Sequence, residues 1–427
     1  MSGAIQPKGW CPGALRPMLS GDGYLVRLRI TGGVLCASAA SAIAHCAQTY
    51  GNGLLDLSAR ANLQLRGVQE DSLPALVAAL QVHGLIDENA QAESVRNVMA
   101  SPLAGLASDS AFDVSPHVRA LEQRLASDAL LHALPSKFGF IVDDGGCLSL
   151  SGASADIRFV ALHGEGAPRF MVSLAGCEDA ALIAAQDLPD VAARLAMAFL
   201  YVARACQTPP RRMGALVAVR GAAAIWRAAG LEVKPQAQRA SIPPQPLGHH
   251  ALGASGWLGL GFAFGRLRAR DLAWLADMAT TYGGGELRLT PWRAILLPGV
   301  DARAAQEILA QAPADMIVDP SDARLCVVAC PGHPACASAT TPTQEDALAL
   351  APLARALAPA GAGLHVSGCA KGCARPSPTA VTLVARAGLY DLVAAGCASD
   401  TPVQQGLDLH ACRAALRAWA STNGARL

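Results

Sequence analysis

The sequence predicts an α+β fold made of two related halves. Three observations support this prediction: a strand, helix, strand pattern occurs twice, the two copies keep a constant spacing, and a Pro-rich segment separates them. Tyr50-Gly-Asn-Gly53 lines up with Tyr282-Gly-Gly-Gly285, 232 residues later. The same spacing relates two further pairs, Leu57-Ser58 with Leu289-Thr290 and Gly67-Val68 with Gly299-Val300.

Each copy of the repeat begins with a strand, a helix and a strand-like stretch. In the first copy, residues 24–30 alternate apolar and basic side chains, as a half-buried strand does, and residues 37–50 have helical character before a strand at 54–68. In the second copy, the corresponding elements are expected at residues 257–264, 271–282 and 286–300.

A larger part follows each copy of the repeat. Residues 242–248 (Ile-Pro-Pro-Gln-Pro-Leu-Gly) are interpreted as the linker between the halves. In the first half we expect a helix over residues 191–206, and strands over 138–142 and 169–173. The expected domains are residues 1–100, 101–235, 236–305 and 306–427. Two related halves are expected to meet across a pseudo-two-fold axis, and ligand sites favour such seams.

Composition excludes several classes of protein. The chain has 427 residues and a net charge of +1, so no global field indicates a nucleic acid or membrane surface as partner. No run of about 20 apolar residues is present to span a membrane. The first residues, Met-Ser-Gly-Ala-Ile-Gln-Pro-Lys, lack the pattern of a signal peptide, so a cytoplasmic location is expected.

Four of the thirteen cysteines form a spaced constellation. Cys330 and Cys336 make a C-x5-C, and after 32 intervening residues Cys369 and Cys373 make a C-x3-C. Strand-like residues 325–329 precede the first pair and residues 363–367 precede the second. Gly and Pro around the thiols allow the tight turns that an iron–sulfur cluster requires.

A [4Fe–4S] cluster and a structural zinc ion both take four thiolates. Zinc favours two to four residues between paired cysteines, which the x5 gap does not fit, so a cluster is expected. The alternative without a metal is that these are unrelated buried thiols. The other nine cysteines show no such spacing, and most are expected to be core thiols: Cys11, Cys36, Cys46, Cys147, Cys177, Cys206, Cys326, Cys397 and Cys412.

The cysteine pairs resemble the cluster motif of the siroheme-dependent sulfite and nitrite reductases. Three further segments are similar to that family in the same order: Ser58-Ala-Arg-Ala-Asn-Leu-Gln-Leu, Arg96-Asn-Val-Met and Leu134-Pro-Ser-Lys-Phe138. The resemblance implies a sulfite/nitrite reductase-like fold, in which each half has a ferredoxin-like β-α-β part and a larger α/β part, the second of which binds the cluster. It also implies that Arg60, Arg96 and Lys137 hold tetrapyrrole carboxylates.

A site for a uroporphyrin-derived macrocycle needs several convergent cations, because the ring carries eight carboxylates. Arginine suits this task through its bidentate geometry. Arg293, at the end of a predicted strand, is added to Arg60, Arg96 and Lys137 as a substrate-binding candidate. Arg66, Arg211 and Arg212 are considered too, but are expected to be solvated surface charges.

Departures from the reductase pattern indicate a different branch of the superfamily. Gly139 stands where the sulfite reductases have a second lysine after Lys-Phe, which weakens the case for siroheme, and Ala-Lys replaces their Pro-Asn between the last two thiols. Residues 11–18, 20–23, 289–294 and 368–374 look like the corresponding segments of the precorrin-3B synthase family.

That second resemblance implies an O2-dependent hydroxylation of precorrin-3A at C20, with the ring-A acetate closing to a γ-lactone in aerobic cobalamin biosynthesis. Electrons come ultimately from a reduced nicotinamide. The chain has no G-x-G-x-x-G between a strand and a helix, so a separate NADH-dependent reductase or a ferredoxin is expected to supply them.

A fully ligated cluster is a poor place for O2 to bind, so a mononuclear non-haem iron is expected beside it. Such irons often take two histidines and a carboxylate. The candidates are His249, His250, His333 and His365, none with a diagnostic spacing; His333 and Lys371 are alternatively expected to tune the cluster.

Two other functions stay open at this point. One is a siroheme-dependent assimilatory sulfite or nitrite reductase, in which Cys373 bridges cluster and haem. The other is a carrier of electrons or tetrapyrroles with a cluster and no O2 chemistry.

Overall fold

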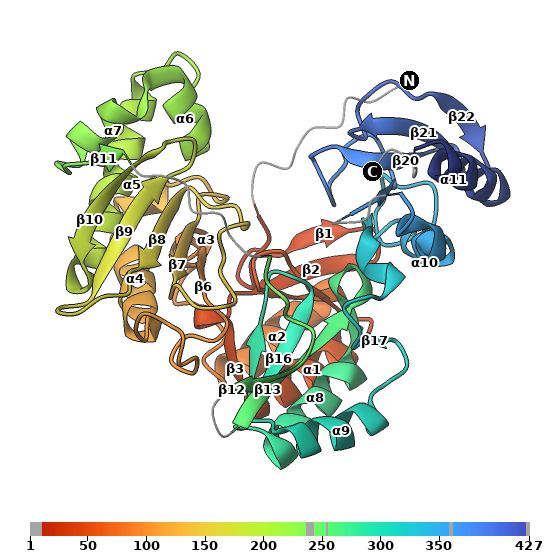
Figure 1. Cartoon of the computed structure of the whole chain (residues 1–427), viewed down its shortest axis with the longest axis horizontal. Coiled ribbons are helices and arrows are strands. Elements are labelled where there is room, and N and C mark those ends of the chain that lie inside the picture. The colour runs from red at the N-terminus through yellow and green to blue at the C-terminus, as the bar shows by residue number, and fades with distance from the viewer. Residues whose placement is uncertain (1–10, 236–242, 253–254, 358–361, 424–427) are drawn as a thin grey trace.

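The computed structural model describes residues 11–235, 243–252, 255–357 and 362–423. They form four sheets, arranged as a central body and two flanking lobes (Figure 1). The predicted linker at 242–248 is described only from residue 243, and the first ten residues, used for the signal-peptide argument, lie outside the described part. No helix of the described residues is long and apolar enough to cross a bilayer.

The central body holds the two copies of the repeat. The first copy consists of β1 (Met18–Ser20), β2 (Gly23–Leu28), β3 (Val34–Cys36), α1 (Ala37–Tyr50), β4 (Leu54–Leu57), β5 (Leu63–Val68) and α2 (Leu73–Gln81). The second consists of β12 (Gly248–Leu252), β13 (Ser255–Phe262), β14 (Arg266–Arg268), α8 (Ala269–Tyr282), β15 (Glu286–Leu289), β16 (Ala294–Pro298), α9 (Ala302–Gln311) and β17 (Met316–Ile317). The duplication predicted from the sequence is confirmed.

The two copies exchange one strand each. β3 of the first copy pairs with β15 of the second, and β14 of the second pairs with β4 of the first. β3 and β14 are themselves equivalent, because Val34 and Arg266 stand at the start of each, 232 residues apart. This reciprocal exchange is the pairing expected of two halves related by a pseudo-two-fold axis.

Backbone details repeat at the same spacing. Gly32 and Phe264, which occupy equivalent turns, both have φ of 60°. Ala61 and Arg293, in the two strand-connecting turns, have φ of 54° and 61°. A left-handed conformation is unfavourable for residues with a side chain, so its conservation at Arg293 shows that the turn geometry is imposed by the fold.

One hydrophobic core joins the two copies. It contains Ile43 and Ala44 of α1 together with Leu272 and Leu275 of α8, all 3% exposed or less. The helices α1 and α8 lie on the same side of the sheets (Figure 1). Burial of these apolar faces, at about 25 cal/mol per Å², fixes the halves to each other.

The flanking lobes share a strand order. The first contains β6 (Val98–Ala100), β7 (Phe140–Asp143), β8 (Ile157–Ala161), β9 (Arg169–Leu174), β10 (Asp179–Ala184) and β11 (Lys234–Pro235), with α3 (Ala90–Val95), α4 (Ser115–Ser127), α5 (Leu188–Arg204), α6 (Met213–Arg220) and α7 (Ala222–Ala228). The second contains β18 (Val327–Ala329), β19 (Leu364–Ser367), β20 (Thr379–Arg386), β21 (Leu389–Gly396) and β22 (Gln404–Leu407), with α10 (Thr343–Ala354) and α11 (Leu409–Asn423). In each sheet the first two pairings are parallel, and the next is antiparallel.

Three predicted strands were wrong in part. Residues 54–68 and 286–300 are each two antiparallel strands joined by a turn, not one strand. The apolar pattern runs on through both strands, which hides the turn. Residues 325–329 begin as a short 3-10 turn (Ala323–Cys326) and become β18 only at Val327.

Candidate functional site

The four spaced cysteines follow two neighbouring strands. Cys330 comes directly after β18, and Cys369 comes two residues after the end of β19. β18 and β19 are parallel and paired, so their carboxyl ends open at the same edge of the sheet. Loops at such an edge are a common place for ligands in open α/β sheets.

The loops around these thiols are tightly fitted. The amide of Gly368 donates to Sγ of Cys330 at 3.1 Å. A Cβ on Gly368 would lie 2.6 Å from Cβ of Ala339 and 3.3 Å from that sulfur, so only glycine fits there. The close approach of this amide to the sulfur therefore depends on the missing side chain.

The thiols influence one another electrostatically. Burial raises the pKa of Cys373, and the nearby thiols of Cys369, Cys330 and Cys336 raise it further. Cys330 is buried, Cys336 and Cys369 are half-buried, and Cys373 is exposed. The four sulfurs therefore share one neighbourhood that opens to the surface at Cys373, and their role as cluster ligands stays a prediction.

The first half of the chain clasps the loop between Cys330 and Cys336. The carbonyl oxygen of Ala335 accepts from Nη2 of Arg66 at 3.1 Å, from Oγ of Ser20 at 2.7 Å and from the amide of Gly21 at 3.2 Å. Three donors converge on one carbonyl. The turn between β1 and β2 thus holds the thiol loop against the central body.

Arg66 is not the solvated surface charge that the sequence led us to expect. Its side chain is 3% exposed and forms ion pairs with Asp22 and Asp56, each at 2.9 Å. Arg212 is only partly exposed and pairs with Asp156 at 3.0 Å. Both expectations were wrong because these arginines meet Asp22, Asp56 and Asp156 only in the folded chain.

A cationic group lies where the central body meets the first lobe. Burial lowers the pKa of Arg27 to about 10, and the neighbouring Arg29 and Arg60 lower it further. Burial also lowers the pKa of Arg60, and Arg212 adds to the effect. Arg27 and Arg29 were missed in the sequence, although their alternation with apolar residues at 24–30 was visible.

Two of these arginines lack a carboxylate partner. Arg27 donates to Oε1 of Gln64, and Arg60 donates to the carbonyl oxygen of Lys137 at 2.8 Å. Arg293 likewise donates to the carbonyl of Val327 at 3.0 Å, and burial lowers its pKa. In the described part of the chain none of the three forms an ion pair with a carboxylate, although Cys11 acts favourably on Arg27 and Arg60 and Asp156 acts favourably on Arg60. Each of the three can therefore accept a carboxylate of an anionic ligand without displacing an existing ion pair.

The other two predicted carboxylate binders are placed differently. Arg96 is paired with Asp87 at 2.8 Å and with Glu122 at 2.9 Å, and its pKa is raised by these carboxylates against the effect of burial. A ligand carboxylate would have to displace one of them. Lys137 is exposed and adjoins Arg60 through its backbone.

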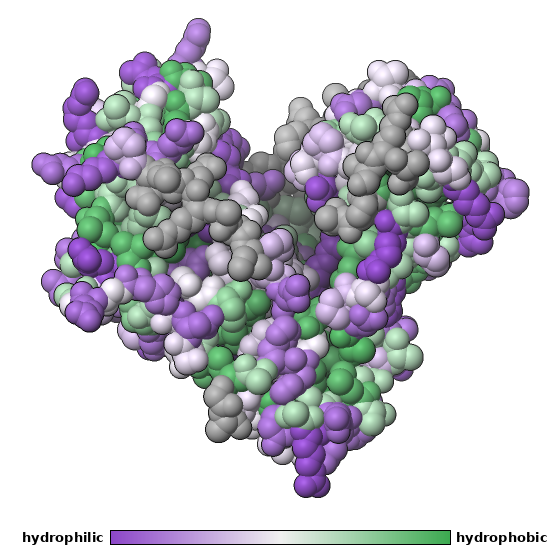
Figure 2. Space-filling view, in the orientation of Figure 1, coloured by the Kyte–Doolittle hydropathy of each residue, from purple (hydrophilic) through white to green (hydrophobic). Residues whose placement is uncertain are grey.

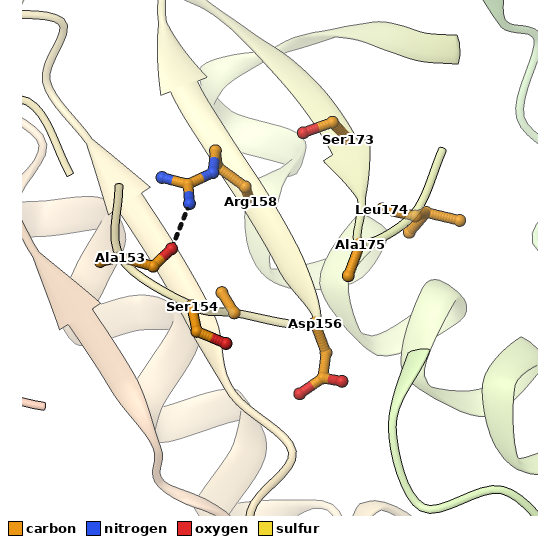
Figure 3. Close-up of a pocket in the computed structure, with 8 residues that line it drawn as sticks. Ala153, Ser154, Asp156, Arg158, Ser173, Leu174 and Ala175 are labelled. Atoms are coloured by element: carbon orange, nitrogen blue, oxygen red, sulfur yellow. Dashed lines mark hydrogen bonds between the residues drawn. The ribbon is translucent and has the colours of Figure 1, made fainter. Parts of the chain in front are cut away.

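Two cavities adjoin this cationic group. The larger, of about 210 Å³, lies beside Asp156, where the loop 153–156 meets the start of β8 and the end of β9 (Figure 3). There Arg158 is turned back onto the carbonyl oxygen of Ala153, at 2.6 Å (Figure 3). Ser154 lines both cavities, and the smaller one is also lined by Arg60, Asn62, Asn97, Val98, Met99, Gly139 and Phe140. Anions entering beside Arg60 therefore meet a wall that is about half polar.

The four candidate histidines are not brought together. His249 and His250 lie on β12, where His250 stacks on Trp257 with 4.0 Å between ring centroids. His333 is exposed in the thiol loop, and His365 is fully buried on β19. Among residues 11–235, 243–252, 255–357 and 362–423, no three His, Cys, Asp or Glu side chains are arranged to hold a single metal ion.

The expectation that most of the other nine cysteines are core thiols was wrong. Cys46 and Cys412 are buried, whereas Cys36 and Cys147 are exposed and the remaining five are half-buried. Most of these cysteines are only half-buried because they lie in loops or at the boundary between the buried and exposed faces of helices.

The surface is hollowed between the two lobes, above the central body (Figure 2). Hydrophilic residues lie around this hollow (Figure 2). A hollow with a hydrophilic rim suits a large polar ligand better than an apolar one.

The matches to known protein families follow this layout. A model described as "Nitrite/Sulfite reductase ferredoxin-like half domain" matches residues 16–83 and 253–312, the two copies in the central body. A model described as "Nitrite and sulphite reductase 4Fe-4S domain" matches residues 91–236, the first lobe. The second lobe repeats its strand order and carries the four thiols.

The chain is similar to proteins of two named activities. A precorrin-3B synthase of Sinorhizobium sp is 32% identical over 93% of this chain and 85% of its own length. A ferredoxin–nitrite reductase of Synechococcus elongatus is 28% identical over 86% of this chain and 77% of its own length. The solved NirA protein of Mycobacterium tuberculosis superposes with a TM-score of 0.72 at 20% identity, over 90% of this chain and 77% of that one, which shows a shared fold.

Proposed function

The chain belongs to the nitrite and sulfite reductase family, and we propose that within this family it catalyses the precorrin-3B synthase reaction. In that reaction O2 hydroxylates precorrin-3A at C20, and the ring-A acetate closes to a γ-lactone. One oxygen atom enters the product, and the other leaves as water after taking up two electrons and two protons.

The observation that carries this proposal is the set of half-buried arginines without ion pairs. Arg27 and Arg60 line the seam with the first lobe, and Arg293 reaches the strand that leads to Cys330. A partly desolvated charge without a counter-ion is unfavourable, so a ligand with several carboxylates is the partner that stabilises these arginines. Precorrin-3A is such a ligand.

The second lobe fits a [4Fe–4S] cluster. Cys330 already accepts a backbone N–H, and glycine at 372 adopts a φ of 59° between Cys369 and Cys373, as a tight wrapping loop requires. A cluster spreads its thiolates over four iron atoms, whereas zinc needs them on one ion. When bound, the cluster supplies single electrons to the neighbouring tetrapyrrole site.

The residues do not fit a preformed mononuclear iron centre. No described trio of ligating side chains converges, and the four histidines lie in three separate places, namely β12, the loop between Cys330 and Cys336, and β19. We therefore assign no step to such an iron, and its ligands stay a prediction from the resemblance.

The chain's own residues would bind and orient the substrate. Arg60 is held toward the first lobe by the Lys137 carbonyl, which leaves its remaining N–H groups for a carboxylate. Arg66 and Ser20 fix the thiol loop to the same body that carries Arg27 and Arg60. Substrate and electron source would thus share one rigid frame. The proposed setting is cytoplasmic, with an external NADH-dependent reductase or ferredoxin as electron donor.

The test is a single-turnover reaction of reduced protein with precorrin-3A and ¹⁸O2. The expected result is a product that carries one ¹⁸O atom, detected by mass spectrometry. Return of unchanged precorrin-3A from protein with a full, reducible cluster would contradict the proposal and favour a carrier.

A siroheme-dependent reductase is the second candidate. The 28% identity to a ferredoxin–nitrite reductase favours it. Extraction of an iron chlorin from anaerobically purified protein, together with reduction of sulfite or nitrite, would support this alternative.

A further inference from the structure

His365 is a fully buried histidine with both ring nitrogens unpaired. Its exposure is 0%, and neither Nδ1 nor Nε2 has a hydrogen-bond partner in the described part of the chain. Leaving a buried polar group unsatisfied is unfavourable. Such a group calls for a ligand or ion that completes its surroundings.

The side chain of His365 faces the loop between Cys369 and Cys373. Leu364 and Val366, its neighbours on β19, pack into the core beneath α10 and α11, so His365 points to the opposite face of the sheet. Ser367, on that same face, donates to the carbonyl of Cys369 at 2.7 Å. A Cβ on Gly372 would lie 3.8 Å from Cε1 of His365. The imidazole therefore lies directly against the segment that presents Cys369 and Cys373.

The charge state of His365 is set by its surroundings. Burial, followed by the positive charge of Arg375, lowers the pKa of the imidazole to about 4. A neutral imidazole has one N–H donor and one bare nitrogen. His365 thus keeps one hydrogen bond to give.

We propose that His365 donates this hydrogen bond to a sulfur of the [4Fe–4S] cluster, either a bridging sulfide or a cysteine thiolate. The proposal rests on the cluster of the proposed function and adds a positioning residue to it. A hydrogen bond to sulfur stabilises the extra negative charge of the reduced cluster, so it makes reduction easier. His333 is the contrasting histidine, because it is exposed in the other thiol loop.

The experiment compares reduced wild-type protein with His365→Leu, His365→Gln and the control His333→Leu. Pulsed EPR on ¹⁵N-histidine-labelled wild type is expected to show a weak nitrogen coupling and an exchangeable proton coupled to the cluster. His365→Leu is expected to lose both signals and to shift the midpoint potential to a more negative value. His365→Gln should recover part of the shift through its amide N–H, and His333→Leu should behave as wild type.

Iron and acid-labile sulfide in wild-type protein are measured first, and their absence would overturn the proposed function itself. A full cluster without histidine coupling in labelled wild type would overturn only the role of His365, even if the leucine variant failed to fold. A large nitrogen coupling, as from a direct iron ligand, would also overturn it. Loss of the coupling in His333→Leu, with the coupling retained in His365→Leu, would show that His333 is the donor and would overturn the proposal.

Discussion

Arg66 donates to the carbonyl oxygen of Ala335 across 269 residues of sequence, and this contact ties the first half of the chain to the loop between two predicted cluster cysteines. The same guanidinium pairs with Asp22 and Asp56. One side chain therefore links three segments: the β1–β2 turn, β4 and the thiol loop.

Removing Arg66 is expected to destabilise the fold and loosen the cluster loop. Arg66→Ala removes the ion pair of the largely buried Asp22 and one of the two pairs of Asp56, which keeps Arg266 at 2.9 Å. Breaking a buried pair of this kind costs about 3–5 kcal/mol. Chemical denaturation measures the loss of unfolding free energy. The iron content after desalting measures how well the loop between Cys330 and Cys336 still holds the cluster. The control is Arg303→Ala, which removes an exposed pair with Glu307 and should leave both readings unchanged. Equal stability of the two variants would contradict the assigned role.

Replacing Cys369 is expected to abolish the broad visible absorption of the purified protein. The serine oxygen is a poor substitute for a thiolate ligand of iron. Cys397→Ser is the matched control, because this half-buried thiol lies in the same lobe and donates to the Pro376 carbonyl. A Cys369→Ser protein with full colour and an unchanged EPR spectrum would refute the ligand assignment.

Substitution of Arg60 is expected to weaken ligand binding, whereas substitution of Arg96 is expected to lower the stability of the fold. Arg60→Ala removes a cation without an ion pair and should weaken tetrapyrrole binding about tenfold to a hundredfold, with little change in stability. Arg96→Ala breaks pairs with Asp87 and Glu122 and should lower stability by about 3 kcal/mol. Fluorescence titration with uroporphyrin and thermal unfolding separate the two effects. A binding loss in Arg96→Ala that exceeds the loss in Arg60→Ala would reverse these assignments.

Gly139 is expected to control the space beside Arg60. A Cβ at this position would lie 3.5 Å from the Asn97 carbonyl and 4.0 Å from Nη1 of Arg60, which is ordinary contact. Gly139→Ala should therefore bind uroporphyrin nearly as wild type does, whereas Gly139→Leu should lose at least about tenfold, as overfilling costs about 1–3 kcal/mol. Unfolding curves show whether each variant is folded. Wild-type affinity in folded Gly139→Leu would mean that the ligand does not lie beside Gly139 and Arg60.

Cys36 and Cys147 are expected to react differently although both are exposed. A hydrogen bond from Ser38 lowers the pKa of Cys36. Partial burial and then the charge of Asp109 raise the pKa of Cys147 to about 11. Because the thiolate is the nucleophile, iodoacetamide should modify Cys36 first at pH 8.

The pH dependence follows from these directions. The rate at Cys147 should keep rising about tenfold per pH unit until near pH 11, while the rate at Cys36 levels off below its ordinary pKa. Peptide mass spectrometry follows both sites. Ser38→Ala should slow Cys36 and Asp109→Asn should speed Cys147; faster labelling of Cys147 in the unmodified protein would contradict both assignments.

The sequence predicted the repeat and its helices well because their signals are local. The predicted helix at 37–50 matches α1, and the predicted helix at 271–282 begins two residues inside α8. The exchange of β3 and β14 could not be predicted, because each short strand pairs with a partner more than two hundred residues away. Strand pattern shows which face is apolar but not which neighbour it joins.

Only the parts of the candidate site that belong to a sequence motif could be predicted from the sequence. The four thiols stand out by spacing, whereas the burial of Arg66 and His365 depends on contacts between distant segments. Charge type alone does not separate a paired arginine such as Arg96 from an unpaired one such as Arg27. Only the geometry of the folded chain makes that distinction.

The strand exchange in the central body also governs how the protein is made. During synthesis, β4 emerges early but has to wait for Arg266–Arg268 before its open edge is covered. An open edge is a template for association with other chains. A fragment that ends before β14 would therefore aggregate rather than fold, and the two halves form a single unit of expression.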